Sequence, residues 1–207
     1  MYTPPAFRIA DLAEIHAAMA ESRLATLVTP TAQGLQATPL PLYLEPAEGP
    51  HGTLYGHVAR ANPHWSTPPT GESAALFQGP HAYVTPSWYP GKAEHHKVVP
   101  TWNYQAIHAH GPVEFFEDAT RLLAVVTRLT QLHEAAMPTP WAVSDAPPDF
   151  IAGMLRAIVG FRLPIARLEA KRKMSQNRPP ADRAAVAVAL AASPRPSDRE
   201  AAALIPS

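Results

Sequence analysis

Residues 24–42 read LATLVTPTAQGLQATPLPL, and this stretch decides the fold. Its first third is apolar and β-branched, as expected of a strand, and Gln33-Gly34 suits the tip of a hairpin. The returning strand, expected over 35–45, is interrupted by Pro39 and Pro41. Because these prolines stand two residues apart, their missing N–H groups fall on one edge. This predicts an edge strand or a strand that faces a ligand.

Short strands joined by turns continue outward from this hairpin. Further strands are expected at residues 52–59, 74–78, 82–85, 101–116 and 158–170, with Gly79-Pro80 as a break and 171–180 as an irregular segment. Helical patterns follow the capping residues Asp11 and Asp118, and the end of the chain is alanine-rich and helical. Adjacent strands with short connections pair antiparallel. We therefore predict a mainly β protein with peripheral helices, whose strands close or nearly close into a barrel.

The composition agrees with this class. Proline accounts for 25 of 207 residues, about 12% against about 5% on average, which is typical of a loop-rich β protein. The absence of cysteine excludes disulfides, thiolate metal ligands and cysteine nucleophiles. Lys+Arg and Asp+Glu both number 17, so no overall field favours nucleic acid or a membrane. With no signal peptide and no long apolar run, we expect a cytoplasmic protein that does not contact a membrane.

The segment GHVARANPHW at residues 56–65 holds a first candidate site. A strand runs into a turn with Arg60 and Asn62, and Pro63 suits the first position of a helix. Free N–H groups beside an arginine suit a phosphate, whereas the alternative is an ordinary capped turn with an exposed arginine. The stretch ATPLPL over 37–42 is equally open. It suits a flat heterocycle bound by the backbone, or a plain edge strand that proline protects from aggregation.

Residues 156–183 concentrate positive charge, with eight Lys or Arg and two acids. Interleaved Ser, Gln and Asn side chains add hydrogen-bond donors. Three roles remain open for the segment: a phosphate site, a nucleic-acid contact or a solvated loop. The aromatic side chains that single-strand binders interleave with their cations are missing, which argues against that kind of binding.

Histidines and aromatic residues gather between residues 77 and 116. On a strand that starts at Trp102, one face carries Trp102, Tyr104, Ala106, His108 and His110. His-x-His can present two imidazoles to one metal, but the third ligand would have to come from His81, His95 or His96. The chain has no cysteine and no companion carboxylate motif. We therefore favour histidines packed among aromatic side chains and predict no metal site.

Six ordered segments together resemble the PaiB family, described as FMN-binding negative transcriptional regulators. They are MYTPPAF (1–7), ATPLP (37–41), GHVARANPHW (56–65), YVTPSWY (83–89), VPTWNY with HAHG (99–104 and 108–111) and KMSQNR (173–178). The resemblance runs from residue 1 to about 185. It implies the antiparallel split β-barrel of FMN-binding, pyridoxamine phosphate oxidase-like proteins. It also implies a homodimer with FMN in the clefts between subunits.

The resemblance implies roles for matched positions. The FMN phosphate would lie at Arg60 and Asn62, and the isoalloxazine along Thr38, Leu40 and Leu42. Trp102 and Asn103 would come from the partner side of the cleft. The segment that closes over phosphate or ring would use Lys173, Ser175, Gln176 and Arg178. His64 and Met174 stand where relatives are expected to carry Gln and Leu.

The implied function is a homodimeric negative transcriptional regulator that binds FMN, with DNA as a further partner. The alternative is an FMN-dependent oxidoreductase or flavin reductase that uses NAD(P)H, in which His57, Tyr104, His108 or His110 would tune the flavin. A third alternative is a haem-binding split barrel with a histidine as axial ligand. We expect residues 1–180 to form the FMN-binding domain and 181–207 to form an alanine-rich helical tail, packed on it or extending from it.

Overall fold

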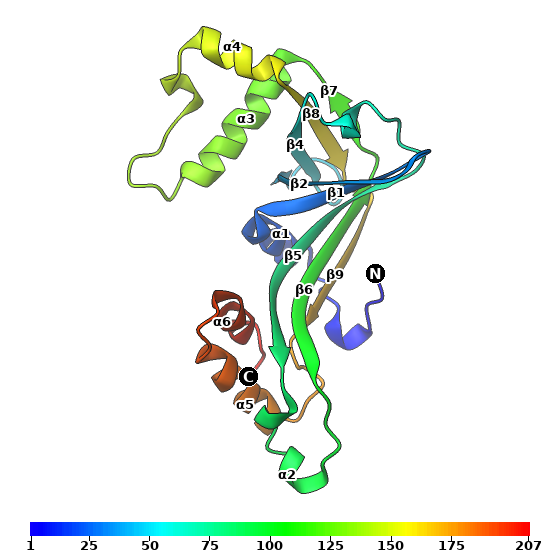
Figure 1. Ribbon diagram of the computed structural model, residues 1–207, viewed down its shortest axis with the longest axis vertical. Helices are drawn as coiled ribbons and strands as arrows, with labels where there is room; N and C mark the ends of the chain where they lie inside the picture. Colours follow the sequence, from blue (N-terminus) through cyan, green and yellow to red (C-terminus); the bar gives the residue numbers. More distant parts are fainter. The chain divides into compact units, whose positions relative to one another are not determined.

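The computed structural model describes residues 1–207, except for the side chains of Glu94 and His95 (Figure 1). The chain divides into two compact units. The first unit holds residues 1–15, 78–107 and 169–207, and the second holds 16–77 and 108–168. Some elements contribute residues to both: α1 (Leu12–Ser22), β5 (Ser73–Val84), β6 (Thr101–Gly111) and β9 (Arg167–Lys173). The expected boundary at residue 180 stays a prediction.

The hairpin forms as its sequence predicts. Strands β1 (Leu24–Thr31) and β2 (Gly34–Pro41) pair antiparallel up to Thr31 and Gly34, which leaves two residues for the tip. Gly34 has a φ of +109°, which a side chain would resist. In the sheet order β2-β1-β5-β6-β9, β2 is the edge strand. The edge position inferred from the two prolines is therefore confirmed.

A second sheet of the second unit has the order β3-β4-β8-β7. Its strands are β3 (Tyr43–Glu45), β4 (Thr53–Ala59), β8 (Ile158–Pro164) and β7 (Glu114–Phe116). The unit also contains α3 (Ala119–Glu134), α4 (Pro148–Arg156) and the short 3-10 turns η2 (Pro63–Trp65) and η4 (Val143–Asp145). β4 and β8 pair antiparallel along their full length. The antiparallel pairing expected from short connections is thus present.

Helix α3 covers this sheet with the apolar face that its periodicity predicts. The Asp118 carboxylate accepts the Arg121 N–H at 2.8 Å and caps the helix start. Buried side chains of the helix and its neighbours form one cluster: Phe116, Leu122, Val125, Leu129 and Leu155. A Cβ on Gly160 would lie 2.4 Å from the Phe116 ring, so only glycine lets the helix-facing cluster approach β8 this closely.

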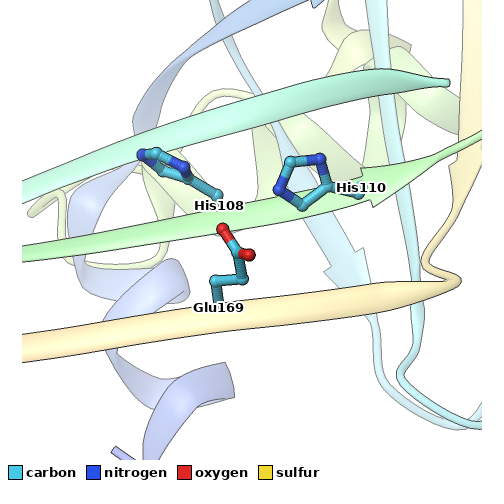
Figure 2. Close-up of side chains that lie close together, drawn as sticks. All are labelled: His108, His110 and Glu169. Atoms are coloured by element: carbon cyan, nitrogen blue, oxygen red, sulfur yellow. The ribbon is translucent and has the colours of Figure 1, made fainter. Parts of the chain in front are cut away.

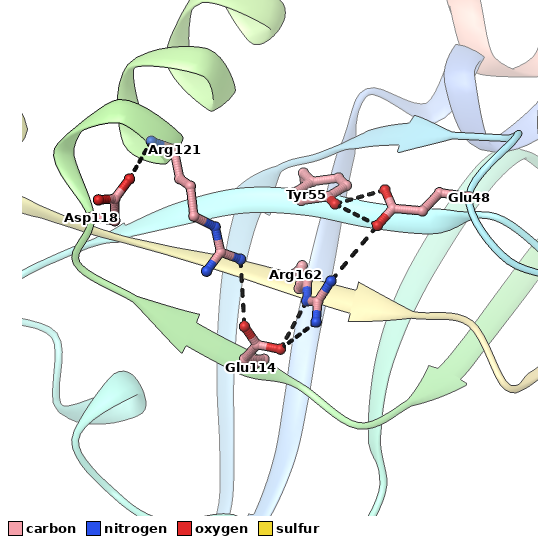
Figure 3. Close-up of polar contacts among 6 residues, drawn as sticks. All are labelled: Glu48, Tyr55, Glu114, Asp118, Arg121 and Arg162. Atoms are coloured by element: carbon pink, nitrogen blue, oxygen red, sulfur yellow. Dashed lines mark hydrogen bonds and ion pairs between the residues drawn. The ribbon is translucent and has the colours of Figure 1, made fainter.

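The edge of the same sheet carries an exposed polar network (Figure 3). Arg162 donates to Glu114 at 2.8 Å and lies 3.8 Å from Glu48, while Arg121 lies 3.4 Å from Glu114. The Tyr55 hydroxyl donates to the Glu48 carboxylate at 2.7 Å. Burial, followed by this hydrogen bond, raises the pKa of Tyr55 to about 12. The Arg162 hydrogen bond lowers the pKa of Glu114.

Strand β5 corrects one expectation. The sequence predicts two strands separated by Gly79-Pro80, whereas Ser73–Val84 is one continuous strand. A Cβ on Gly79 would lie 3.1 Å from the Cβ of Gln105, so the glycine makes room for the neighbouring side chain instead of breaking the strand. Strand β9 likewise continues to Lys173, three residues into the segment predicted as irregular.

The first unit is completed by short helices. They are η1 (Pro5–Phe7), η3 (Pro86–Trp88), α2 (Lys92–His95), α5 (Pro180–Ala191) and α6 (Pro196–Ala203). The alanine-rich end of the chain is helical, as predicted. Val186, Leu190 and Ala201 are buried in one cluster with Val84 and Met174. The tail therefore packs within this unit through its apolar face.

Among the described residues, no helix combines the length and the apolar composition that crossing a membrane requires.

Candidate functional site

Strand β2 presents alternate side chains to the interior of the second unit. Thr38 is half-buried, Leu40 is buried, and Leu42, just beyond the strand, is buried as well. Ala37 and Pro39 on the opposite face are exposed. Of the three predicted ring contacts, Thr38 therefore offers a polar group, while Leu40 and Leu42 are largely occupied in the core.

Asn62 connects β2 with the turn after β4. Its side-chain oxygen accepts the His64 N–H at 2.9 Å and caps η2, which Pro63 begins. Its amide nitrogen donates to the Thr38 hydroxyl at 3.2 Å. The structure thus brings together Thr38 and Asn62, two of the residues expected at the cofactor. The local sequence, a cap followed by proline, folds as predicted.

His64 stands at the centre of what we call the hydroxyl–imidazole chain: Thr38, His64, Thr29 and Ser73. The two ring nitrogens of His64 lie 2.8 Å from the hydroxyls of Thr38 and Thr29, and Thr29 lies 2.9 Å from the Ser73 hydroxyl. The imidazole is 1% exposed, and burial lowers its pKa. His64 is therefore neutral at physiological pH, with one ring nitrogen donating and the other accepting.

Sequence reasoning treated His64 only as a departure from a family pattern. Thr29 and Ser73 lie 35 and 44 residues from their partners in the chain, on β1 and β5. No local spacing rule links positions so far apart. The one available signal was that His64 follows a capped turn into a strand-rich region.

Arg60 is fixed at the end of β4 by several contacts. Its guanidinium donates to the carbonyl oxygens of Arg156 at 2.6 Å and Ile158 at 3.3 Å, and it forms an ion pair with Glu117. The group also lies 5.8 Å from the Trp65 ring centre. Its side chain remains partly exposed. An anion can therefore reach Arg60, although it would have to share the cation with Glu117.

His57 lies on a different face of β4 from the one that packs on Leu42. A Cβ on Gly56 would meet Leu42, and a Cβ on Gly160, the cross-strand partner of His57, would meet Phe116. Since direct cross-strand neighbours share a face, His57 faces the α3 side. Its Nδ1 atom is buried without a hydrogen-bond partner among the described residues, and burial lowers its pKa. The structure does not group His57 with Thr38.

The first unit contains the remaining predicted residues. Asn103 and Ser175 are both buried, and the Asn103 amide lies 3.1 Å from the Ser175 hydroxyl. Ser175 has a φ of +63°, in the left-handed region that costs a side-chain-bearing residue energy. The pair therefore holds a tight bend directly after β9. Asn103 supports Ser175 and is not itself open to a ligand.

Residues 171–178, which we call the cationic strand end, hold several closely spaced charges. Lys173 donates to the Trp102 carbonyl at 2.6 Å and to the Thr101 hydroxyl. Burial lowers the pKa of Lys173, and the charges of Lys171 and Arg178 lower it further. The segment is consequently electropositive and would gain from a bound anion.

Two other predicted residues of this segment have separate roles. Gln176 accepts the Met174 N–H at 2.6 Å and donates to the Arg172 carbonyl, so it shapes the bend. The Arg178 guanidinium lies 4.8 Å from the Tyr89 ring centre. Trp102 is 52% exposed and makes an edge contact with Tyr83 at 5.9 Å between ring centres. Trp102 is thus exposed, whereas Arg178 is half-buried, as are Lys173 and Gln176.

Sequence reasoning gave Lys171 no individual role. Its side chain is buried, donates to the Tyr2 carbonyl at 3.2 Å and lies 5.0 Å from the Tyr104 ring centre. An ammonium group over an aromatic face is stabilised by the ring quadrupole. Because Tyr2 is 169 residues away in the chain, this burial leaves no signature in local sequence.

His108 and His110 project from one face of β6, as the strand periodicity predicts. Figure 2 shows their imidazoles, whose centres are 6.1 Å apart, and draws Glu169 on β9. His110 lies 3.9 Å from Glu72. His96 is exposed, and the side chain of His95 lies outside the described residues. The predicted absence of a metal stays a prediction.

Comparisons with known proteins show which sequences and structures this chain resembles. Residues 1–167 match a family described as "Putative FMN-binding domain". The chain is 36% identical over 180 residues to the "Protease synthase and sporulation protein PAI 2" of Bacillus subtilis (strain 168), covering 86% of this chain and 83% of that protein.

Two solved structures share the fold at low sequence identity. The flavocytochrome Anf3 from Azotobacter vinelandii matches with a TM-score of 0.59 and 15% identity, over 78% of this chain and 67% of that one. The FAD and heme binding protein from Mycobacterium smegmatis matches with a TM-score of 0.57 and 12% identity, over 80% and 73%. The predicted fold class, a mainly antiparallel split β-barrel with peripheral helices, is confirmed.

Proposed function

Since the chain belongs to the PaiB family of FMN-binding-domain proteins, we propose that it binds FMN as a homodimer. Two observations carry this proposal: the hydrogen bond from Asn62 to Thr38, and the partly exposed guanidinium of Arg60, two residues before Asn62 in the chain. A guanidinium, an amide and a hydroxyl are the donors that a phosphate monoester requires. We assign the FMN phosphate to Arg60 and Asn62.

The groups of the second unit also fit the flavin ring. The Gln36 side-chain oxygen is buried without a partner among the described residues. Gln36 lies on the same face of β2 as Thr38, two residues before it. An unpaired buried acceptor is costly, and a ring N–H would satisfy it. Gln36 was not singled out in the sequence, because its missing partner is visible only in the fold.

The cationic strand end would supply further positive charge to a bound flavin. In a homodimer, Lys173 and Arg178 would lie over phosphate or ring, and the exposed Trp102 of the partner subunit would offer a stacking surface. Asn103 would act by holding Ser175 in its left-handed conformation. Leu40 would support the strand from within the core.

Bound FMN would supply hydride and electron transfer, and the chain would bind and orient it. We propose the role of a negative transcriptional regulator, which is the role that the resemblance to the PaiB family implies. DNA and NAD(P)H are then the partners to test. An oxidoreductase would oxidise NAD(P)H with FMN present, whereas a regulator would bind promoter DNA with an affinity that falls steeply with salt.

The decisive experiment measures FMN affinity by fluorescence quenching in matched variants. Arg60→Ala should weaken binding by about 1.5–3 kcal/mol, or roughly 10–150-fold. Glu117→Gln should tighten binding, because it removes the carboxylate that competes with the phosphate for Arg60. Arg156→Ala serves as the control and should leave the affinity unchanged, because the Arg156 side chain is exposed and the substitution retains the backbone carbonyl that accepts from Arg60.

Three results would count against the proposal. Equal FMN affinity in Arg60→Ala and the parent protein would remove the phosphate assignment. A purified protein that takes up no added FMN would overturn the cofactor. A sharp Soret band instead of flavin absorbance would favour the haem alternative.

A further inference from the structure

A pocket in the second unit lies apart from the polar residues assigned to FMN, although Leu42, one of the predicted ring contacts, also lines it. It has a volume of about 410 Å³ and is bordered by α1, the connection from β2 to β3, β4 and the end of α3. Arg60, Asn62 and Thr38 do not line it. Pockets of about 300–1,000 Å³ commonly hold small molecules. The size therefore suits a compact ligand.

The floor of this pocket is apolar. Met19, Leu42, Leu54 and Phe77 line it, and each is at least nine-tenths buried. Leu132, 43% exposed, also lines the pocket. These side chains offer no hydrogen bonds, so the body of a ligand there must itself be apolar.

Part of the remaining lining is basic. Arg23, Arg128, His16 and His133 contribute to it, and none of the described residues that line the pocket is acidic. Four other arginines of the second unit have carboxylate partners: Arg60 with Glu117, Arg121 and Arg162 with Glu114, and Arg167 with Glu72. Arg156, which lies outside the pocket, has none among the described residues. Within the described chain, Arg23 and Arg128 have no such partner. Two unneutralised guanidinium groups therefore border one apolar pocket.

Two further details favour an anion there. Arg23 has a φ of +43°, a conformation that costs a residue with a side chain energy and often marks a functional position. Burial, and then the nearby charges of Glu45 and Glu48, raise the pKa of Tyr43, which also lines the pocket, so its hydroxyl stays protonated and can donate a hydrogen bond. Arg128 lies close enough to Tyr43 to interact with it electrostatically.

We propose that this pocket binds a small apolar molecule that ends in a carboxylate. The carboxylate would lie between Arg23 and Arg128, where a planar guanidinium can donate two parallel hydrogen bonds. The apolar body would lie against Met19, Leu54 and Phe77. This second ligand site is independent of FMN, since the two sets of residues do not overlap in their charged groups.

The test compares phenylacetate and octanoate with their neutral amides by isothermal titration calorimetry on the full chain. Both acids should bind more tightly than their amides. Arg23→Gln and Arg128→Gln should each weaken acid binding by about tenfold or more, because each removes a charged hydrogen bond. Arg156→Gln is the matched control, since its arginine is exposed and lies outside the pocket. It should bind the acids as the parent protein does.

Two further variants separate this proposal from folding defects and from the FMN site. Ala20→Phe fills the pocket from an exposed helix position and should abolish acid binding with an unchanged circular dichroism spectrum. Arg60→Ala should retain acid binding even where FMN binding is lost. Equal affinity for acid and amide, unchanged binding in both Arg23→Gln and Arg128→Gln, or no saturable binding of either acid would each overturn the proposal.

Discussion

The hydroxyl–imidazole chain and the cationic strand end differ in charge and in how far their polar groups are paired. In the second unit, the buried ring of His64 has a hydrogen-bond partner for each nitrogen, and its neutral form is favoured. In the first unit, the positive charges of Lys171 and Arg178 disfavour the charged form of Lys173. All polar groups of the first arrangement are paired within the protein, whereas a bound anion would stabilise the second.

The two regions illustrate two different things that a protein can offer a ligand: fixed geometry and electrostatic attraction. The neutral ring of His64, with both nitrogens hydrogen-bonded, holds Thr38, which in turn accepts from Asn62. Because the ring carries no charge, it neither attracts nor repels a distant ligand. A group of unneutralised cations supplies attraction and binding energy but little fixed geometry. Substitutions in the hydroxyl–imidazole chain should therefore lower the free energy of unfolding. Substitutions in the cationic strand end should instead change how that free energy depends on pH.

The largest expected effect follows removal of the His64 ring. His64→Ala should lower the free energy of unfolding by about 3 kcal/mol, because it opens a cavity and leaves buried hydroxyls with fewer partners. Urea unfolding measures the change. His133→Ala, at a histidine with no hydrogen-bond partner among the described residues, is the control and should differ by less than about 0.5 kcal/mol. Equal stability of the two variants would show that the chain of hydrogen bonds contributes nothing.

The same burial predicts an acid sensitivity. His57 and His64 have lowered pKa values in the fold, whereas in the unfolded chain they titrate near 6.5. Above pH 6.5 neither state binds the proton. As pH falls below 6.5, the two histidines bind protons in the unfolded state but not in the native state. The free energy of unfolding therefore falls by up to about 1.4 kcal/mol per pH unit for each histidine.

Variants make this dependence specific. The slope of unfolding free energy against pH, measured from pH 7 to 5, should decrease in His57→Gln and again in the double variant with His64→Gln. The control is His51→Gln, at a half-buried histidine outside both sites, and it should retain the parent slope. A parent protein with constant stability over this range would contradict the neutral state assigned to both buried rings.

Local signals were readable in the sequence where both partners lie within a few residues. Asn62 caps η2 two residues before His64, Asp118 caps α3 three residues before Arg121, and the tip of the hairpin closes at Gly34. Each follows from hydrogen bonds that the chain makes with itself over one turn. The fold class follows from many such short signals together.

Contacts between distant segments were not readable in this way. The sequence predicts Arg60 as a phosphate ligand but gives no sign of its partner Glu117, which lies 57 residues along the chain. The sequence predicts a break in β5 at Gly79-Pro80, because glycine and proline usually end strands. The strand continues because Gly79 leaves room for the side chain of Gln105, which is 26 residues away in the chain. His57 was grouped with the cofactor residues by sequence proximity, although the pleat of β4 turns it to the opposite face.

A smaller effect is expected at the cationic strand end. Burial and the neighbouring cations lower the pKa of Lys173 below that of the unfolded chain, so the charged form destabilises the fold. Between the lowered pKa and about 10.5, the unfolded state binds more protons, and stability rises with pH. Lys173→Met should flatten this rise, as guanidinium unfolding from pH 8 to 10.5 would measure. An identical pH profile in Lys173→Met and the parent protein would remove the charge conflict on which the contrast with His64 rests.

The smallest effect is expected in the exposed network of Figure 3. Comparing it with the buried ring of His64 tests whether burial determines how much stability a polar contact contributes. Glu114→Gln breaks the contacts with Arg162 and Arg121, yet both arginines stay solvated, so the loss should be about 0.2–1 kcal/mol. Raising the NaCl concentration to about 1 M should abolish most of this difference, because salt screens exposed charges. His64→Ala should keep its full effect in the same salt, since a neutral buried ring is not screened. A loss of stability in Glu114→Gln as large and as insensitive to salt as that in His64→Ala would show that burial is not what distinguishes them.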